Sequence, residues 1–258
     1  MATPLKGSLL VLERQARVYK HTWRASIIST FLSPTLLLLA MGVGLGSLVD
    51  QRDAPAGLPY LTWLAPGLLA AAAMQTAAGD SAYPVMAGIK WIKSYDAALA
   101  SPIEVHHIVG GHVAWVMLRL VMVSVVFAGV MTAFGATSLA ESLLSIGPAV
   151  LTGFAFIGPV TAYTAGLQKE TGLASLFRFG IVPLFLFSGT FFPISQLPDW
   201  MEPLAFLTPL WHGVELTRWA ALGLDPTLSP VTHSLVLFGV GAVFPALAYR
   251  RLAGRLIA

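Results

Sequence analysis

Six stretches of this chain contain no Asp, Glu, Lys or Arg, and each is long enough to cross a bilayer, which takes about 20 apolar residues. They are Ala25–Val49, Ala54–Gly79, Leu120–Ala140, Ser142–Gln168, Phe179–Pro198 and Pro226–Tyr249. Only 10% of the 258 residues are charged and 56% are hydrophobic, whereas about 25% of an ordinary soluble domain is charged. The composition excludes a soluble globular protein and predicts an all-α polytopic membrane protein.

These stretches predict a single transmembrane domain, residues 1–258, with six membrane spans. The spans are expected over residues 26–49, 60–79, 108–134, 143–167, 173–192 and 231–249. Residues 1–25 have one apolar and one basic face, with Tyr19 and Trp23 on the apolar one, which predicts an amphipathic helix in the membrane interface. Residues 84–107 are expected to form a cytoplasmic loop, and residues 193–214 a re-entrant or external segment too short to span.

The basic residues indicate how the chain is oriented. The net charge is +3, and most Lys and Arg residues lie between the predicted spans, so we interpret them as topology signals and not as a nucleic-acid surface. Of the 15 Lys and Arg residues, 12 fall on the side that holds both termini, Arg52 and Arg218 fall on the other side, and Arg119 is the remaining one. The positive-inside rule therefore places both termini in the cytoplasm, with six spans. No cleavable signal peptide is expected, because the first 24 residues lack an apolar core.

Few residues of the chain suit catalysis or metal binding. No Gly-x-x-x-x-Gly-Lys-Ser/Thr loop occurs, so the sequence lacks an ATPase site of the P-loop kind. Neither a cysteine nor a His-Glu-x-x-His motif occurs, and we predict no metal site. Ser188 near the end of one apolar stretch and His233 at the start of another leave an intramembrane serine hydrolase as an alternative.

Arg119 is the only clear intramembrane charge, since Arg178 at the start of the fifth predicted span is counted with the cytoplasmic loop before it, and two interpretations of Arg119 stay open. It either contacts an anionic lipid or substrate headgroup, or it reaches toward the cytoplasm or pairs with a carbonyl or carboxylate. Aromatic side chains crowd the outer end of the fifth predicted span, where they either line the path of an amphipathic substrate or form an interface belt. They are Phe185, Phe187, Phe191, Phe192 and Trp200.

The run from Ser188 to Trp200 reads SGTFFPISQLPDW, and the stretch Leu207-Thr208-Pro209-Leu210 and then Arg218 follow it. This pattern resembles the end of the last-but-one span and the re-entrant loop of type-2 ABC exporter permeases. It looks nearest the branch that contains nodulation-type lipo-oligosaccharide exporters and bacterial drug exporters. The order of elements is similar along nearly the whole chain, including the cytoplasmic stretch from Ala98 to Ile103, ALASPI.

The resemblance implies a role for each segment. In such permeases the loop between spans 2 and 3 docks on a separate ATP-binding subunit, and the substrate passes between two permease subunits along spans 2 and 5. The residues that couple the chain to the ATPase subunit would be Tyr95, Asp96, Leu99, Ser101 and Pro102. The substrate path would contain Met74, Gln75, Arg119, Phe187 and Phe191. The outer gate would consist of Phe192, Pro193, Leu197, Pro198 and Trp200.

By this resemblance the chain is the permease subunit of an ATP-driven exporter that moves a lipid, glycolipid, lipo-oligosaccharide or drug by alternating access. Two ATP-binding subunits would hold ATP and Mg²⁺, a second copy or a related permease would complete the complex, and this chain would need no cofactor. Membrane lipids are a further expected partner, and nucleic acid is not. From the residues alone, the serine hydrolase and a membrane assembly subunit that transports nothing stay open as alternatives.

Overall fold

The computed structural model describes residues 4–50 and 55–257, and within this part of the chain every regular element is a helix. In chain order these elements are α1 (Pro4–Leu37), the π-helix η1 (Leu38–Leu45), α2 (Gly46–Asp50), the 3₁₀ turn η2 (Pro55–Gly57), α3 (Tyr60–Met86), the π-helix η3 (Ala87–Trp91), α4 (Ser94–Leu99), α5 (Val105–Ala133), α6 (Leu139–Gly166), α7 (Thr171–Leu176), the π-helix η4 (Phe177–Ile181), α8 (Val182–Phe187), the 3₁₀ turn η5 (Ile194–Gln196), α9 (Glu202–Phe206), α10 (Pro209–Leu222) and α11 (Pro230–Leu256).

Four of the described helices are long and apolar enough to cross a membrane: α3 with η3, α5, α6 and α11. The prediction of an all-helical membrane protein is confirmed at this level. The first predicted span, 26–49, falls on the second half of α1, on η1 and on α2. The fifth falls on the continuous run from α7 to α8, Thr171–Phe187, which is shorter than a typical span. The total of six spans stays a prediction.

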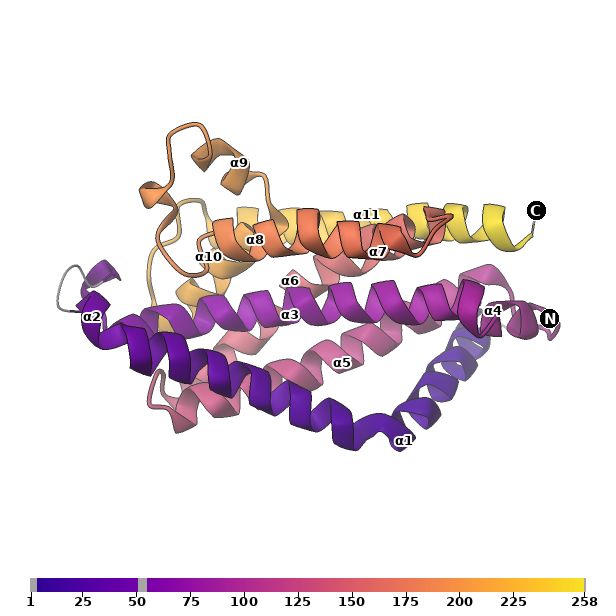
Figure 1. Cartoon of the computed structure of the whole chain (residues 1–258), viewed down its shortest axis with the longest axis horizontal. Coiled ribbons are helices and arrows are strands. Elements are labelled where there is room, and N and C mark those ends of the chain that lie inside the picture. Colours follow the sequence, from indigo (N-terminus) through magenta and orange to yellow (C-terminus); the bar gives the residue numbers. More distant parts are fainter. Residues whose placement is uncertain (1–3, 51–54, 258) are drawn as a thin grey trace.

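The long helices lie side by side along the long axis of the molecule (Figure 1). Both termini and α4 lie at one end, which we call the α4 end. The opposite end carries α2, η5 and α9, with α9 standing clear of the bundle, and we call it the α9 end. Figure 1 also shows that α1 changes direction sharply, so that its first part runs at an angle to the rest of the helix.

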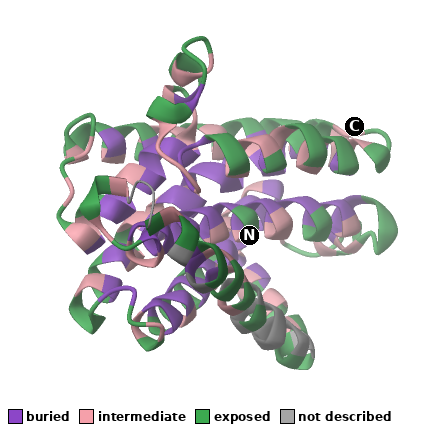
Figure 2. Ribbon diagram, turned by 60° about the vertical axis from the view of Figure 1, so that its left-hand side comes forward, coloured by how far each residue is buried: buried purple, intermediate pink, exposed green. Residues whose placement is uncertain are grey.

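Helix α3 is the central element of the bundle. It packs against α5, α6 and α10. In the most apolar 18-residue stretch of α3 and η3, 72% is buried inside the protein, whereas in the corresponding stretch of α11 only 22% is buried. The buried face of α3 includes Leu64, Leu68 and Leu69 and the alanine run at residues 70–73. Small alanine side chains let neighbouring helices approach closely. Within a bilayer the hydrophobic effect does not drive helices together, so such close packing is what stabilises their association. Figure 2 shows the buried residues along the middle of the bundle and exposed residues around its periphery.

Local capping explains why α6 and α11 begin before the residues predicted for them. Helix α6 begins at Leu139 because Ser138 and Glu141 form a capping box, in which the Ser138 amide donates to a Glu141 carboxylate oxygen at 2.7 Å. The Glu141 amide donates back to the Ser138 hydroxyl at 3.3 Å. Helix α11 begins at Pro230 because the Ser229 hydroxyl caps it by accepting from the Thr232 amide at 3.2 Å.

The fifth predicted span ends earlier than expected. Its helix stops at Phe187 and not at residue 192, because Gly189 adopts a positive φ of 79° and Pro193 follows four residues later. The segment predicted as re-entrant, 193–214, contains η5 and α9 and then enters α10, which continues to Leu222. Gly223, with a φ of 65°, ends α10. Whether this segment re-enters the membrane stays a prediction.

The second predicted span is longer than expected. We placed its end at residue 79, but α3 and η3 continue without interruption to Trp91, and Pro84 lies within the helix. The non-helical part of the predicted 84–107 loop therefore begins only at Ile92. One consequence is that Asp80 lies inside a helix of the bundle, so Arg119 is not the only charged residue there.

Candidate functional site

At the α4 end, Tyr95 anchors α4 to the bundle. Its ring is buried against Gly88, where an added Cβ would lie 2.6 Å from the ring carbons. Burial raises the pKa of the Tyr95 phenol to about 12, so the side chain is neutral at physiological pH. Only a residue without a side chain at position 88 allows this contact. Tyr95 therefore connects α4 rigidly to the inner end of the α3–η3 helix.

The other predicted coupling residues lie at the surface of the α4 end. Asp96, Ser101 and Pro102 are exposed, and Leu99 is half-buried. The Ser101 hydroxyl donates to the Ala98 carbonyl at 2.6 Å, which closes the turn after α4. Two large apolar side chains beside them are also exposed, Trp91 by 48% and Ile92 by 72%. We call this set the α4 surface: Trp91, Ile92, Asp96, Ser101 and Pro102.

The residues predicted for the substrate path separate into two groups. Met74 is fully buried in the core of the chain, whereas its neighbour Gln75 is exposed, because successive residues of a helix point about 100° apart. Phe187 is exposed at the end of α8. Phe191 is half-buried and makes an edge contact with Phe185, with ring centroids 4.8 Å apart. Gln75 and Phe187 are thus open to a partner, and Met74 is not.

Arg119 pairs with a carboxylate, as one of its two interpretations predicted. Its Nε donates to Asp80 Oδ2 at 3.2 Å, and its Nη1 donates to the Tyr19 hydroxyl at 2.9 Å. The guanidinium also lies 4.8 Å from the centre of the Tyr19 ring, within reach of a cation–π contact. The side chain is 12% exposed. Sequence reasoning missed Asp80 because it placed that residue beyond the end of the second span.

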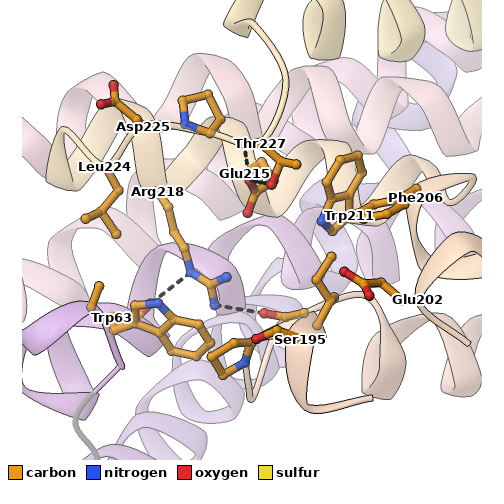
Figure 3. Close-up of a pocket in the computed structure, with 15 residues that line it drawn as sticks. Trp63, Ser195, Glu202, Phe206, Trp211, Glu215, Arg218, Leu224, Asp225 and Thr227 are labelled. Carbon is orange, nitrogen blue, oxygen red and sulfur yellow. Dashed lines mark hydrogen bonds between the residues drawn. The ribbon is translucent and has the colours of Figure 1, made fainter. Parts of the chain in front are cut away.

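At the α9 end, the loops and helices enclose a cavity of about 420 Å³ (Figure 3). Arg218 of α10 points into it, toward Trp63 of α3 (Figure 3). Of the five predicted gate residues, Pro193 lines this cavity and the other four do not. Leu197 is buried, Phe192 is half-buried, and Pro198 and Trp200 are exposed. Trp200, at 70% exposure, is among the most open aromatic side chains of the described region.

The Arg218 guanidinium is buried and is held by backbone carbonyls. Its Nε donates to Trp63 at 3.2 Å, and its Nη2 donates to Gly189 at 2.9 Å and to Thr190 at 3.2 Å. The guanidinium also lies 3.5 Å from the centre of the Trp63 ring. A planar, multidonor cation suits this arrangement, which joins α10, α3 and the segment after α8. We call it the Arg218 cage.

The Arg218 cage was not predicted, because we counted Arg218 among the external loop cations when assigning the orientation. The structure corrects this: Arg218 is only 6% exposed and lies inside α10. One signal could have found it. Arg218 is the only basic residue within an otherwise largely apolar stretch from Leu210 to Leu222, and such an arginine needs internal partners.

The two residues of the serine hydrolase alternative are not brought together as a catalytic pair. The Ser188 hydroxyl bonds to the Thr208 hydroxyl at 3.0 Å. His233 shares a hydrogen bond with His212 between their Nδ1 atoms at 2.7 Å. Within the described part of the chain no hydrogen bond joins Ser188 to His233. A nucleophilic serine needs its base within hydrogen-bond reach, so this geometry lends the alternative no support.

Comparison of the sequence with known proteins shows its family. The model of the ABC-2 type transporter family matches residues 8–222. This chain belongs to the ABC-2 type transporter family. The expected resemblance is confirmed, and the chain is a transmembrane ABC-2 export permease.

Individual relatives agree with the family. The chain is 31% identical to Nodulation protein J of Sinorhizobium fredii over 217 residues, which cover 83% of this chain and 80% of that protein. It is 26% identical to Nodulation protein J of Rhizobium meliloti over 225 residues, 87% and 83% of the two chains. Inner membrane transport permease YadH of Escherichia coli is 22% identical over 228 residues, 88% and 85% of the two chains. An ABC-2 permease is a multi-pass inner-membrane protein, and its family implies an ABC ATPase partner and a dimeric arrangement.

Proposed function

We propose that this ABC-2 permease, driven by a separate ATPase, exports an amphipathic or hydrophobic substrate such as a lipid, glycolipid, lipo-oligosaccharide or drug. One observation carries the proposal: a chain without a P-loop presents an uncovered α4 surface that is attached to its central helix. Exposed aromatic and aliphatic side chains rimmed by polar ones mark a protein-binding surface. We assign this surface to the ATP-binding subunit, with two permease and two ATP-binding chains in the complex and both termini in the cytoplasm.

The attachment of α4 supports the coupling role. A force on the α4 surface passes through the buried Tyr95 ring to Gly88 and so to the end of the helix formed by α3 and η3. Close-packed contacts transmit displacement because they are not compressible. ATP binds with Mg²⁺ to the partner ATPase. It can shift the equilibrium between the inward and outward states of the complex only as far as it binds one of these states more tightly than the other. The permease alone is therefore not expected to pump.

An open aromatic face supports an amphipathic substrate. Tyr83 of α3 is 50% exposed and stacks on Phe177, with ring centroids 5.5 Å apart. Phe179, two residues farther along the chain than Phe177, is 74% exposed. Gln75 and Phe187 add to the exposed residues of α3 and α8. We assign the substrate path to this face, between two permease subunits. Apolar and aromatic walls with few polar groups suit a ligand that carries an acyl chain.

The Arg218 cage supports the assignment of the outer gate. It ties the carbonyls of Gly189 and Thr190 to α3 and α10, so the start of the gate segment follows any movement of α3. A displacement that begins at the α4 surface can thereby reach the residues from Phe192 to Trp200. The gate opens outward when the two permease subunits rock apart at the α9 end.

The test is affinity purification of the tagged permease from native membranes, followed by identification of the proteins that accompany it. We expect an ABC ATPase with the wild-type chain, and at least tenfold less of it with Asp96→Lys, which reverses the charge at the α4 surface. Asp199→Lys is the matched control, because it makes the same change at an exposed site of the α9 end. Recovery of the intact permease without any ATPase, or equal ATPase loss in both variants, would contradict the proposal.

A further inference from the structure

A cavity of about 300 Å³ lies between α1, α3, α4 and α5, and we call it the polar cavity because several ionisable side chains line it. These ionisable residues are Arg14, Tyr19, Asp80, Tyr95, His112 and Arg119. Arg119 is paired with Asp80, whereas within the described region no acidic side chain forms an ion pair with Arg14. The cavity therefore carries an excess of positive charge.

His112 is the second unusual feature of this cavity. Its side chain is 2% exposed, and neither ring nitrogen has a hydrogen-bond partner among the described residues. Buried polar groups in proteins are nearly always paired, because a buried donor or acceptor without a partner loses the hydrogen bonds that water would give it. An imidazole that lines a cavity and lacks a partner indicates that a polar ligand belongs there.

A second cavity, of about 480 Å³, adjoins the first and is almost entirely apolar. Tyr19 and Arg119 line both cavities, so they form the boundary between them. The rest of the second cavity consists of Trp23 and a stretch of α5. The α5 residues are Val121, Met122, Val123, Val125 and Val126. From Arg119 to Val126 the helix rises about 10 Å, which leads from the polar cavity along an apolar groove.

The size of the side chains between α1 and α5 sets how closely these two helices approach along this site. At Gly111 an added Cβ would lie 2.6 Å from the Ser8 carbonyl and from the Val11 side chain, so α1 and α5 touch there. Farther along, bulky side chains hold the helices apart. Tyr19 and Trp115 meet edge to face with ring centroids 5.5 Å apart. The space that opens beside this contact contains both cavities.

The order of the two cavities matches the order of groups in a bilayer lipid. Tyr95, in the wall of the polar cavity, belongs to the same hydrophobic cluster as Leu252, which follows directly after Arg250 and Arg251. Basic residues of this kind mark the cytoplasmic boundary of a membrane. The polar cavity therefore lies near the headgroups of the inner leaflet, and the valine-lined groove lies deeper along α5.

We propose that these two cavities form a binding site for one anionic phospholipid of the inner leaflet. The phosphate lies in the polar cavity, where Arg14, His112 and Arg119 supply donors, and an acyl chain lies along the groove formed by residues 121–126. The lipid stays bound and is not the exported substrate. The inference rests on the proposed orientation, which places the α4 end at the inner leaflet, and not on the ATPase partner or the exported substrate, so its failure would leave the proposed export function untouched.

The site can be tested by native mass spectrometry of the permease released from nanodiscs that contain equal amounts of phosphatidylglycerol and phosphatidylcholine. We expect one phosphatidylglycerol retained per wild-type chain. Arg14→Gln should reduce this retention about fivefold, because one basic residue near a membrane surface contributes roughly that factor in affinity. Val125→Trp should reduce it as well, by filling the groove at an exposed position.

Two controls distinguish a built site from general adsorption. Arg17→Gln removes an exposed arginine of the same helix that pairs with Glu13 and does not line either cavity. Leu118→Trp adds a ring at an exposed position of α5 outside the groove. Both should retain the lipid as the wild type does. Equal retention of phosphatidylcholine, equal loss in Arg17→Gln, or no lipid retained by the wild type would overturn the proposal.

Discussion

Replacing Arg218 by Leu is expected to cause a large loss of stability. The change leaves the carbonyls of Gly189 and Thr190, which lie outside any helix, without the donor that Arg218 supplies. It also removes the second donor of the Trp63 carbonyl in α3 and the contact with the Trp63 ring. Each unpaired buried carbonyl costs about 1–3 kcal/mol. We expect the detergent-solubilised protein to lose about 4 kcal/mol of unfolding free energy, and its midpoint temperature to fall by about 10 °C.

Thermal unfolding followed by tryptophan fluorescence measures this effect, since Trp63 lies in the cage. Arg218→Lys should recover part of the loss, because an ammonium keeps the charge but cannot donate along three fixed directions. Arg250→Gln is the control for removal of an arginine, because that side chain is exposed near the C-terminus. If Arg218→Leu unfolds within about 2 °C of the wild type, the cage does not hold the α9 end together.

Replacing Gly158 by Val is expected to separate α6 from α11. An added Cβ would lie 2.7 Å from Phe244 Cβ, 2.8 Å from the Phe244 carbonyl carbon and 2.8 Å from Pro245 Cδ. The backbone carbon cannot rotate away as a flexible side chain can, so the helices must shift. Overpacking of this kind costs about 1–3 kcal/mol, and contact with the main chain puts Gly158→Val at the upper end of that range.

The matched control is Gly239→Val, which adds the same side chain to the middle of α11, where an added Cβ would have no neighbour within 4 Å. Both proteins can be compared by the fraction that elutes as a single folded species and by the midpoint of thermal unfolding. We expect Gly239→Val to behave like the wild type. Equal stability of the two variants would contradict the close packing of α6 on α11.

Much of this fold could be predicted from hydropathy and from turn residues. The helices α5, α6 and α11 occur within a few residues of their predicted positions, because long uncharged runs and the residues that cap them are local signals. The end of the fifth span was predicted less closely, at residue 192, whereas its helix ends at Phe187. The end of α3 was harder to predict, because Pro84 and Asp80 suggested a loop, whereas packing keeps the chain helical to Trp91.

The buried polar contacts could not be predicted, because they join residues far apart in the chain. Arg218 meets Trp63 and Gly189, and Arg119 meets Asp80 and Tyr19. The sequence indicated only that an arginine in an apolar stretch needs a partner, and not which one. For the same reason the burial of Met74 and the exposure of Gln75 required the neighbouring helices to be known.

The most direct test of the central claim is photo-crosslinking in living cells. A photoreactive amino acid is introduced in place of Ser101, at the α4 surface, or in place of Ser195, an exposed residue of the α9 end. After irradiation, the crosslinked products are purified and identified. We predict that an ABC ATPase is captured from position 101 and not from position 195. Capture of the ATPase from position 195, or none from position 101 in cells that contain the permease, would contradict the account.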